Sequence, residues 1–252
     1  PSLAMLKYAK AFATKAELKD RYSQYLEDVK AGKKDLKVST TNVYDIYKNR
    51  YNIDADLFFS KLEKIKINCI PIVDTSGSMC DDNDSFGKAL AIGHYLAKCS
   101  TYCPEKVVSF SSRPQLLTLG ETPKIEWDYG YDRIAPKSDS VYQREIASMF
   151  TGDCSNTDFG AVMELLSKLD GDMPEYLVVL SDMEFDCLED RSKSTFEYFK
   201  EEFEKLGFEM PELVFWNVRA RHVHFPTLNE ENVKLVSGAS PKIIEEIIKN
   251  KG

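Results

Sequence analysis

Five residues with oxygen-bearing side chains could together hold a divalent metal ion. Asp74, Ser76 and Ser78 form a D-x-S-x-S pattern, in which one carboxylate and two hydroxyls turn toward a common point. Thr157 precedes a segment with a helical pattern, and Asp182 follows an apolar run. Hydroxyl and carboxylate oxygens are hard ligands that suit Mg²⁺ or Mn²⁺ rather than zinc or copper. The residue types therefore predict a magnesium or manganese site.

Each of these residues also has a plainer interpretation. Asp74 could cap the turn that follows it, Thr157 could be the N-cap of its helix, and Asp182 could be a surface carboxylate. Three further carboxylates would add negative charge near the site without binding the metal directly: Asp158, Glu184 and Asp186. His222 and His224 are expected to be packing or surface histidines rather than a second metal site.

The elements that must position these residues alternate between strands and helices from residue 67 onward. Continuous apolar runs indicate strands that are buried on both faces. Helical patterns between them predict a doubly wound α/β sheet that is mostly parallel. Residues 115–119 follow the second strand too closely for a helical crossover, so they should return as one antiparallel edge strand. The expected strands cover residues 67–73, 107–110, 115–119, 176–180, 213–216 and 233–236, and the expected helices cover residues 86–96, 159–166, 196–206 and 243–248.

This arrangement explains why the oxygen groups should meet. Ligands of such sheets bind beyond the carboxyl ends of the strands. Asp74 directly follows the first strand, and Gly77 lets the chain bend tightly after it. Residues 120–140 show no period and are expected to form a long ordered loop.

Residues 1–66 are predicted to be a separate α-helical region, the end of a larger helical domain, ahead of the domain at 67–252. Helical spacing favours helices within residues 16–29, 43–50 and 54–65. Thr14 to Glu17 resembles a capping box, Gly32 should end the first of these helices, and Asp54 should cap the last. No Gly, Pro or Ser linker precedes the first strand, so the apolar stripe of the last helix should pack on the sheet domain. This first region carries a net charge of +5, whereas the remainder carries −13.

Motifs typical of enzymes are missing from the sequence, and catalysis is not expected. There is no G-x-x-x-x-G-K-[ST] loop and no G-x-S-x-G elbow. A phosphatase of the haloacid dehalogenase kind needs a second carboxylate two residues after the first, and Ser76 stands there. Cys80 has no histidine placed by sequence to activate it.

Six cysteines are present without a C-x-x-C pair, so a zinc cage is not expected. We expect free thiols and a cytoplasmic location. No apolar run reaches the length of about 20 residues that a membrane span needs, and no signal peptide is visible. The first residue is Pro1, which suggests a fragment of a longer protein. The cysteines are Cys69, Cys80, Cys99, Cys103, Cys154 and Cys187.

The combination of D-x-S-x-S, a distant Thr157 and Asp182 after a later strand resembles the metal-ion-dependent adhesion site of von Willebrand A domains. The resemblance covers residues 67–252. It implies that the hydroxyls of Ser76 and Ser78 touch the metal, and that Asp74, Thr157 and Asp182 act directly or through water. It also implies an open coordination position for an acidic group of a partner.

A narrower resemblance concerns three blocks, at residues 180–186, 214–219 and 235–240. They are similar to signature blocks of a family of unknown function whose members carry a helical region ahead of a C-terminal A-type domain. The layout also resembles the Ro ribonucleoprotein, in which an A-type domain closes a ring of helical repeats that bind RNA.

The resemblances imply two functions. The first is a divalent-metal-dependent protein-binding module, acting as a scaffold or adaptor in an intracellular complex. The alternative is an RNA-binding ribonucleoprotein component, which the lysine-rich segment at residues 30–37 would favour. The acidic charge of the second region argues against broad nucleic-acid binding there.

Overall fold

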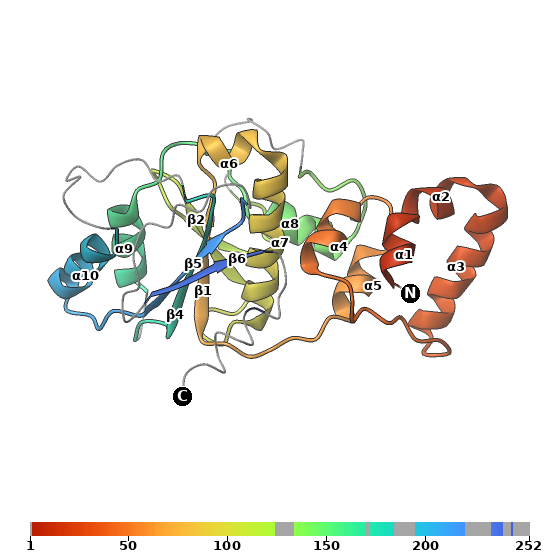
Figure 1. The fold of residues 1–252 in the computed structure, drawn as a ribbon, viewed down its shortest axis with the longest axis horizontal. Helices are drawn as coiled ribbons and strands as arrows, with labels where there is room; N and C mark the ends of the chain where they lie inside the picture. The colour runs from red at the N-terminus through yellow and green to blue at the C-terminus, as the bar shows by residue number, and fades with distance from the viewer. Residues whose placement is uncertain are drawn as a thin grey trace.

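A computed structural model describes residues 2–123, 134–169, 172–183, 195–219, 233–238 and 243. Helices cover both faces of a central sheet, and helices α1 to α5 extend from one side of it (Figure 1). In the described part of the chain, no helix combines the length and apolarity that crossing a membrane requires.

The described strands form one sheet with the order β3-β2-β1-β4-β5-β6. All neighbouring pairs are parallel except β2 with β3, which is the antiparallel edge predicted from the short connection. The fold class expected from the sequence is therefore confirmed. The strands are β1 (Cys69–Asp74), β2 (Lys106–Phe110), β3 (Leu116–Thr118), β4 (Tyr176–Ser181), β5 (Glu212–Asn217) and β6 (Val233–Ser237).

The apolar runs form strands because both faces of the sheet are covered. Every residue of β1 and of β4 is buried. One face packs against α7, which shares its apolar cluster with α8, and the other face packs against α9, which shares its cluster with α10, so two apolar layers enclose the sheet. The helices are α6 (Gly77–Asp81), α7 (Asn83–Cys99), α8 (Val141–Ala147), α9 (Phe159–Ser167) and α10 (Thr195–Leu206).

Two of these helices, α6 and α8, were not predicted. Helix α8 begins where Ser140 Oγ accepts a hydrogen bond from Gln143 N at 3.2 Å, and residues 124–133 of the long loop expected before it lie outside the described part of the chain. Seven residues are too few to reveal a helical period. Helix α6 is a short helix that begins within the D-x-S-x-S segment and extends beyond it to Asp81.

Three helices of the first region, α3 to α5, form where they were expected, whereas α1 and α2 were not predicted as separate helices. Helix α3 ends before Gly32, whose φ of +71° suits the left-handed conformation that ends helices. Asp54 caps α5 by accepting from Leu57 N at 3.0 Å. The helices are α1 (Ser2–Lys7), α2 (Ala9–Thr14), α3 (Ala16–Lys30), α4 (Val43–Asn49) and α5 (Ala55–Ser60).

The capping box expected at Thr14 is wrong. Thr14 is the last residue of α2, and its hydroxyl donates back to Lys10 O at 2.8 Å. Lys15 occupies the N-cap of α3 and makes no side-chain cap. A capping box does form at α4, where Asn42 Oδ1 accepts from Asp45 N at 2.8 Å.

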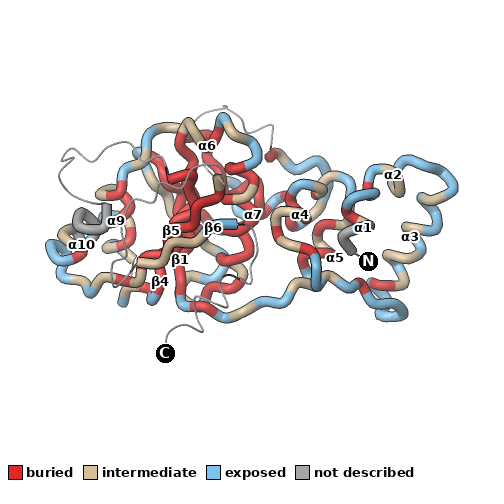
Figure 2. Tube along the Cα trace, viewed as in Figure 1, coloured by how far each residue is buried: buried red, intermediate tan, exposed pale blue. Residues whose placement is uncertain are grey.

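Helices α4 and α5 both pack directly on the sheet domain, and for α5 this packing was predicted from its apolar stripe. Helix α4 lies against α7, and α5 lies against α8. Phe58 of α5 is fully buried, and Phe59 contacts the rings of His94 and Tyr142 at 4.5 and 5.4 Å between centroids. Buried residues continue from the sheet through α7 to α4 and α5 (Figure 2), so the two regions share one core.

Several expectations fall on residues outside the described part. These are the nearby carboxylates Glu184 and Asp186, the histidines His222 and His224, Cys187, and the last helix apart from Ile243. The five described cysteines are all free.

Candidate metal centre

Helix α6 follows β1 at the carboxyl edge of the sheet (Figure 1), and this connection carries the predicted residues Asp74, Ser76 and Ser78. Strand β1 ends at Asp74, and its neighbour β4 ends at Ser181, one residue before Asp182. The register pairs Val73 with Leu180, so the two strand ends lie side by side. Parallel pairing therefore brings two carboxylates together although they are far apart in the sequence.

The carboxylate of Asp74 organises the D-x-S-x-S turn. Asp74 is fully buried, and its Oδ1 accepts a hydrogen bond from Ser76 N at 2.9 Å. Thr75 N donates to Phe110 O at 3.1 Å, which fixes the turn to the end of β2. The hydroxyl oxygens of Ser76 and Ser78 lie 3.2 Å apart. The two hydroxyls thus occupy one small region, as a shared cation would require.

Ser181 is a site residue that the sequence analysis missed. Its hydroxyl donates to Asp74 Oδ2 at 2.5 Å and accepts from Met183 N at 3.0 Å. Burial raises the pKa of Asp74 to about 6, although hydrogen bonds from Ser181 and Ser76 oppose the shift and the charge of Asp182 adds to it. Two carboxylates withdrawn from water at one edge favour a nearby cation.

Thr157 lies in the segment that leads into α9, one residue before the N-cap Asp158. The next residue, Asp158, donates its backbone N–H to Ser111 O at 3.2 Å, just beyond β2. A Cβ atom on Gly77 would stand 3.6 Å from Cys154 O, so this segment packs against the turn. The carboxylate of Asp158 is exposed and caps α9 by accepting from Ala161 N at 3.0 Å.

Asp153 is a second residue that the sequence did not reveal. It is buried, and its Oδ1 accepts from Ser155 N at 3.0 Å. Among the described residues, none forms a hydrogen bond with its Oδ2. Burial raises the pKa of Asp153, but hydrogen bonds from Ser155 and Ser111 and the positive charge of Arg113 outweigh burial and lower it, so this carboxylate is stabilised as an anion by its own neighbours.

Arg219 is the third residue that was missed, and it supplies positive charge. It stands two residues beyond β5, and its Nη1 lies 3.4 Å from Asp182 Oδ2. Its Nε lies 3.9 Å from Oδ2 of Asp82, the residue that caps α7.

The residues fit a hard divalent cation by their chemistry. Asp74, Ser76, Ser78 and Asp182 meet at one edge, and each offers oxygen. No group of three or more His, Cys, Asp or Glu side chains suited to a metal occurs in the described part of the chain. A site of this kind would therefore depend on serine and threonine hydroxyls as well as carboxylates.

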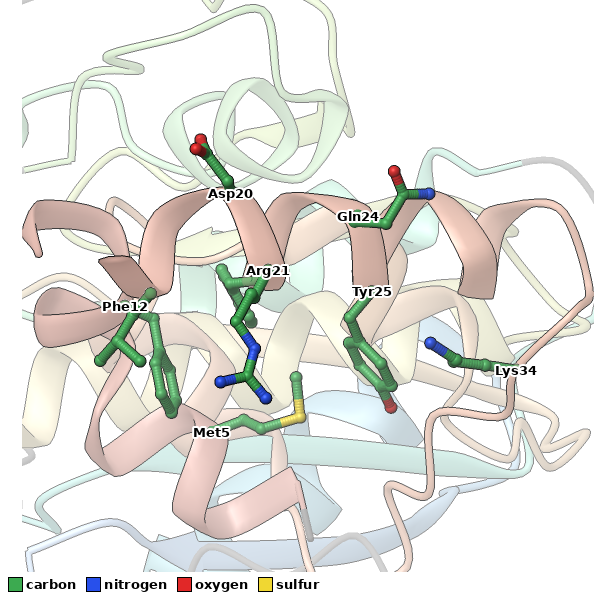
Figure 3. A pocket seen from close by; sticks show the side chains of 9 residues that line it. Met5, Phe12, Asp20, Arg21, Gln24, Tyr25 and Lys34 are labelled. Atoms are coloured by element: carbon green, nitrogen blue, oxygen red, sulfur yellow. The ribbon is translucent and has the colours of Figure 1, made fainter. Parts of the chain in front are cut away.

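A second feature is a cavity of about 910 Å³ between α1, α2 and α3. Figure 3 shows Arg21 and Tyr25 projecting from α3 to the same side, toward Met5, whereas Asp20 and Gln24 point to the other side. Phe12, Tyr22 and Lys34 also line this cavity.

Comparisons of the sequence with known proteins find one family and one relative of uncharacterised function. A family model described as "Domain of unknown function (DUF7788)" matches residues 68–252. "Uncharacterized protein L728" of Acanthamoeba polyphaga mimivirus is 25% identical over 275 residues, covering 98% of this chain and 46% of that protein. The chain thus spans about half the length of this relative.

Solved structures extend the likeness to the fold. The Ro (RSR) protein of Deinococcus radiodurans matches with a TM-score of 0.58 at 15% identity, covering 98% of this chain and 53% of that one. Because nearly the whole chain is aligned, the likeness includes the helices ahead of the sheet. Proximal thread matrix protein 1 from the mussel byssus matches with a TM-score of 0.39 at 12% identity, over 74% of this chain and 47% of that one, which is too low to indicate a shared fold.

Proposed function

The chain belongs to the DUF7788 family, and for it we propose a metal-dependent binding function at the carboxyl edge of the sheet. The edge holds Mg²⁺ or Mn²⁺ and uses it to bind an acidic group of a protein partner. The observation that carries this proposal is the meeting of the Ser76 and Ser78 hydroxyls, 3.2 Å apart, with the buried carboxylates of Asp74 and Asp182.

The roles of the residues follow from their positions. Ser76 and Ser78 would hold the ion through their hydroxyl oxygens, and Thr157 would reach it from the segment before α9. Asp182 would supply negative charge beside it. Asp74, which already accepts hydrogen bonds from Ser181 and Ser76, keeps the turn in shape. A bound divalent ion would supply an electrophilic centre that attracts a carboxylate.

We propose binding rather than catalysis, since the edge lacks an evident pair of nucleophile and base among the described residues. Cys80, the thiol nearest in sequence, is buried and donates to Thr75 O at 3.2 Å. The one described histidine, His94, is engaged with Glu145 at 2.7 Å, on the α7–α8 side of the sheet.

Metal-dependent thermal stability tests the proposal, because an ion that binds only the native state stabilises it. Mg²⁺ or Mn²⁺ at millimolar concentration should raise the melting temperature above that in EDTA. Ser76→Ala combined with Ser78→Ala should abolish the shift without unfolding the protein in EDTA. A matched control is Ser60→Ala, which removes an exposed hydroxyl that bonds to Leu57 O. The absence of any shift in the unaltered protein would contradict the proposal.

RNA binding is a second candidate, and the cavity between α1 and α3 favours it. Phe12 and Tyr25 offer aromatic surfaces beside the cation Arg21, a combination that binds single-stranded nucleic acid. The structure weakens the argument for RNA binding that rests on the lysine-rich segment, because two of its lysines are paired with carboxylates. Lys30 pairs with Asp54 at 2.9 Å, and Lys34 pairs with Asp28 at 2.9 Å.

Titration with a single-stranded RNA oligonucleotide at several salt concentrations tests this candidate. Log affinity should fall linearly with log salt if phosphates are contacted. Arg21→Gln should weaken binding, whereas Arg144→Gln on α8 should leave it unchanged. A flat salt dependence, or equal effects of the two changes, would count against RNA as the ligand.

A further inference from the structure

Arg219 reaches across the carboxyl edge of the sheet from the end of β5. Ser181 of β4 pairs with Asn217 of β5, so Arg219 emerges beside the end of β4. Its backbone N–H donates to Asn217 Oδ1 at 2.9 Å, which fixes the direction of the chain there. The side chain therefore starts from a defined position next to the candidate metal centre.

The guanidinium bridges two carboxylates that belong to different parts of this edge. It lies 3.4 Å from Asp182 Oδ2 through Nη1 and 3.9 Å from Asp82 Oδ2 through Nε. Asp182 ends the β4 side of the centre, and Asp82 follows the turn that carries Ser76 and Ser78. The guanidinium of Arg219 thus links the β4 side of the centre to the segment that follows the D-x-S-x-S turn.

Burial decides which of these contacts matters more. The Asp182 side chain is 0% exposed, whereas 34% of the Asp82 side chain and 30% of the Arg219 side chain are exposed. A carboxylate withdrawn from water needs a positive partner, and an exposed ion pair contributes little. The contact with Asp182 is therefore the more important of the two, because it neutralises a buried charge.

We propose that Arg219 is a built-in counter-cation that competes with the divalent metal for Asp182 and so sets the metal affinity of the centre. This inference rests on the proposed metal-binding function. A divalent ion beside Asp182 would lie close to the guanidinium, and like charges at short range repel. Metal binding must therefore weaken the contact between Arg219 and Asp182.

Replacing Arg219 by a neutral residue tests whether the arginine competes with the metal for Asp182 or instead supports metal binding. In Arg219→Gln, the metal-free protein should melt at a lower temperature, because Asp182 loses its cation. The same variant should bind Mn²⁺ more tightly by roughly threefold to tenfold, because the repulsion is gone. Isothermal titration with Mn²⁺ and melting in EDTA measure the two effects independently.

Two further variants serve as controls. Arg219→Lys keeps the charge and should stay close to the unaltered protein in Mn²⁺ affinity. Arg144→Gln removes an exposed arginine on α8 whose Nη1 donates to Asp139 O, and it should change neither quantity.

The outcomes distinguish this inference from the function on which it rests. If the unaltered protein binds Mn²⁺ but Arg219→Gln binds it equally or more weakly, the competition is disproved and the metal site stands; weaker binding would mean that Arg219 orients Asp182 for the metal. An unchanged melting temperature of Arg219→Gln in EDTA would also overturn the inference. If the unaltered protein binds no Mn²⁺, both proposals fail.

Discussion

The ring of Tyr47 on α4 lies directly over Gly87 on α7, so close that a Cβ atom on the glycine would stand 2.5 Å from Cε1 of the ring. Tyr47 cannot easily move away, because it is buried and the guanidinium of Arg50 lies 4.0 Å from its ring centroid. Helix α4 of the first region and helix α7 of the sheet domain therefore meet through a position that only glycine fits without a shift.

Gly87→Ala should destabilise the protein because the added methyl group overpacks this contact. Overpacking a core typically costs about 1–3 kcal/mol, which offsets the gain of up to about 1 kcal/mol that alanine brings to a helix. We expect a lower urea midpoint. In a Tyr47→Ala background the same change should be neutral or stabilising, and a cost that persists there would contradict the contact as the cause.

Acid should destabilise the protein through His94 between about pH 7 and pH 5. Burial lowers the pKa of His94, although Glu145 opposes the shift, and Lys98 and Lys64 add to it. The buried Nδ1 finds no hydrogen-bond partner in the described part of the chain, as suits a neutral ring whose Nε2–H donates to Glu145. The unfolded chain takes up the proton near pH 6.5 and the folded protein resists it, so stability falls as the pH drops below that value.

Urea denaturation at pH 7.5 and pH 5.5 measures this loss. His94→Gln, which can still donate to Glu145, should lose less stability over the same interval. Equal losses in the two proteins would assign the acid sensitivity to other groups. Glu145 contributes only at lower pH: burial raises its pKa, but hydrogen bonds from His94 and Lys98 outweigh burial and lower it, so its stabilisation is lost only below its ordinary range.

The cysteines should all react as free thiols once the protein is denatured without reductant. In the native protein, half-buried Cys103 and Cys154 should be alkylated before the buried Cys69, Cys80 and Cys99. Burial raises the pKa of Cys69 and of Cys99, which lowers their thiolate fraction further. Peptide mapping after timed alkylation follows each cysteine separately. Fewer than six reactive groups in the denatured sample would indicate an oxidised pair.

Ser181→Ala should lower stability more than an exposed serine change does. The hydroxyl bonds to buried Asp74 Oδ2 and accepts from Met183 N, so its loss leaves buried groups unsatisfied. We expect a cost of about 1–3 kcal/mol by thermal or urea denaturation. Ser60→Ala is the matched control, and a similar small effect of both changes would show that the Asp74 contact contributes little.

The strands and the direction of the edge strand could be predicted because they leave strong local signals. Apolar runs such as 176–180 need no knowledge of the partner strand. The short connection before residues 115–119 excluded a crossover. Thr14 shows the opposite case: its spacing to Glu17 matched a capping box, but helix α2 extends through Thr14 and its hydroxyl bonds backward.

The candidate site was predictable only where the residues follow one another closely. Asp74, Ser76 and Ser78 carry a recognisable spacing, and Asp182 directly follows a predicted strand end. Ser181 could have been found, since it precedes Asp182 at the end of a strand that was expected beside β1. Arg219 and Asp153 left no such signal, because their roles depend on strand register and on loop packing.

The shared core also determines where the protein can be divided. The family match begins at residue 68, yet the packing surface of α7 is completed by α4 and α5, which precede that residue. A fragment that starts at the first strand would leave the rings of His94 and Tyr142 without Phe59 and would expose the groove that Tyr47 fills. The sequence match therefore starts inside the packed core rather than at its boundary, because α4 and α5 precede residue 68 and pack on α7 and α8.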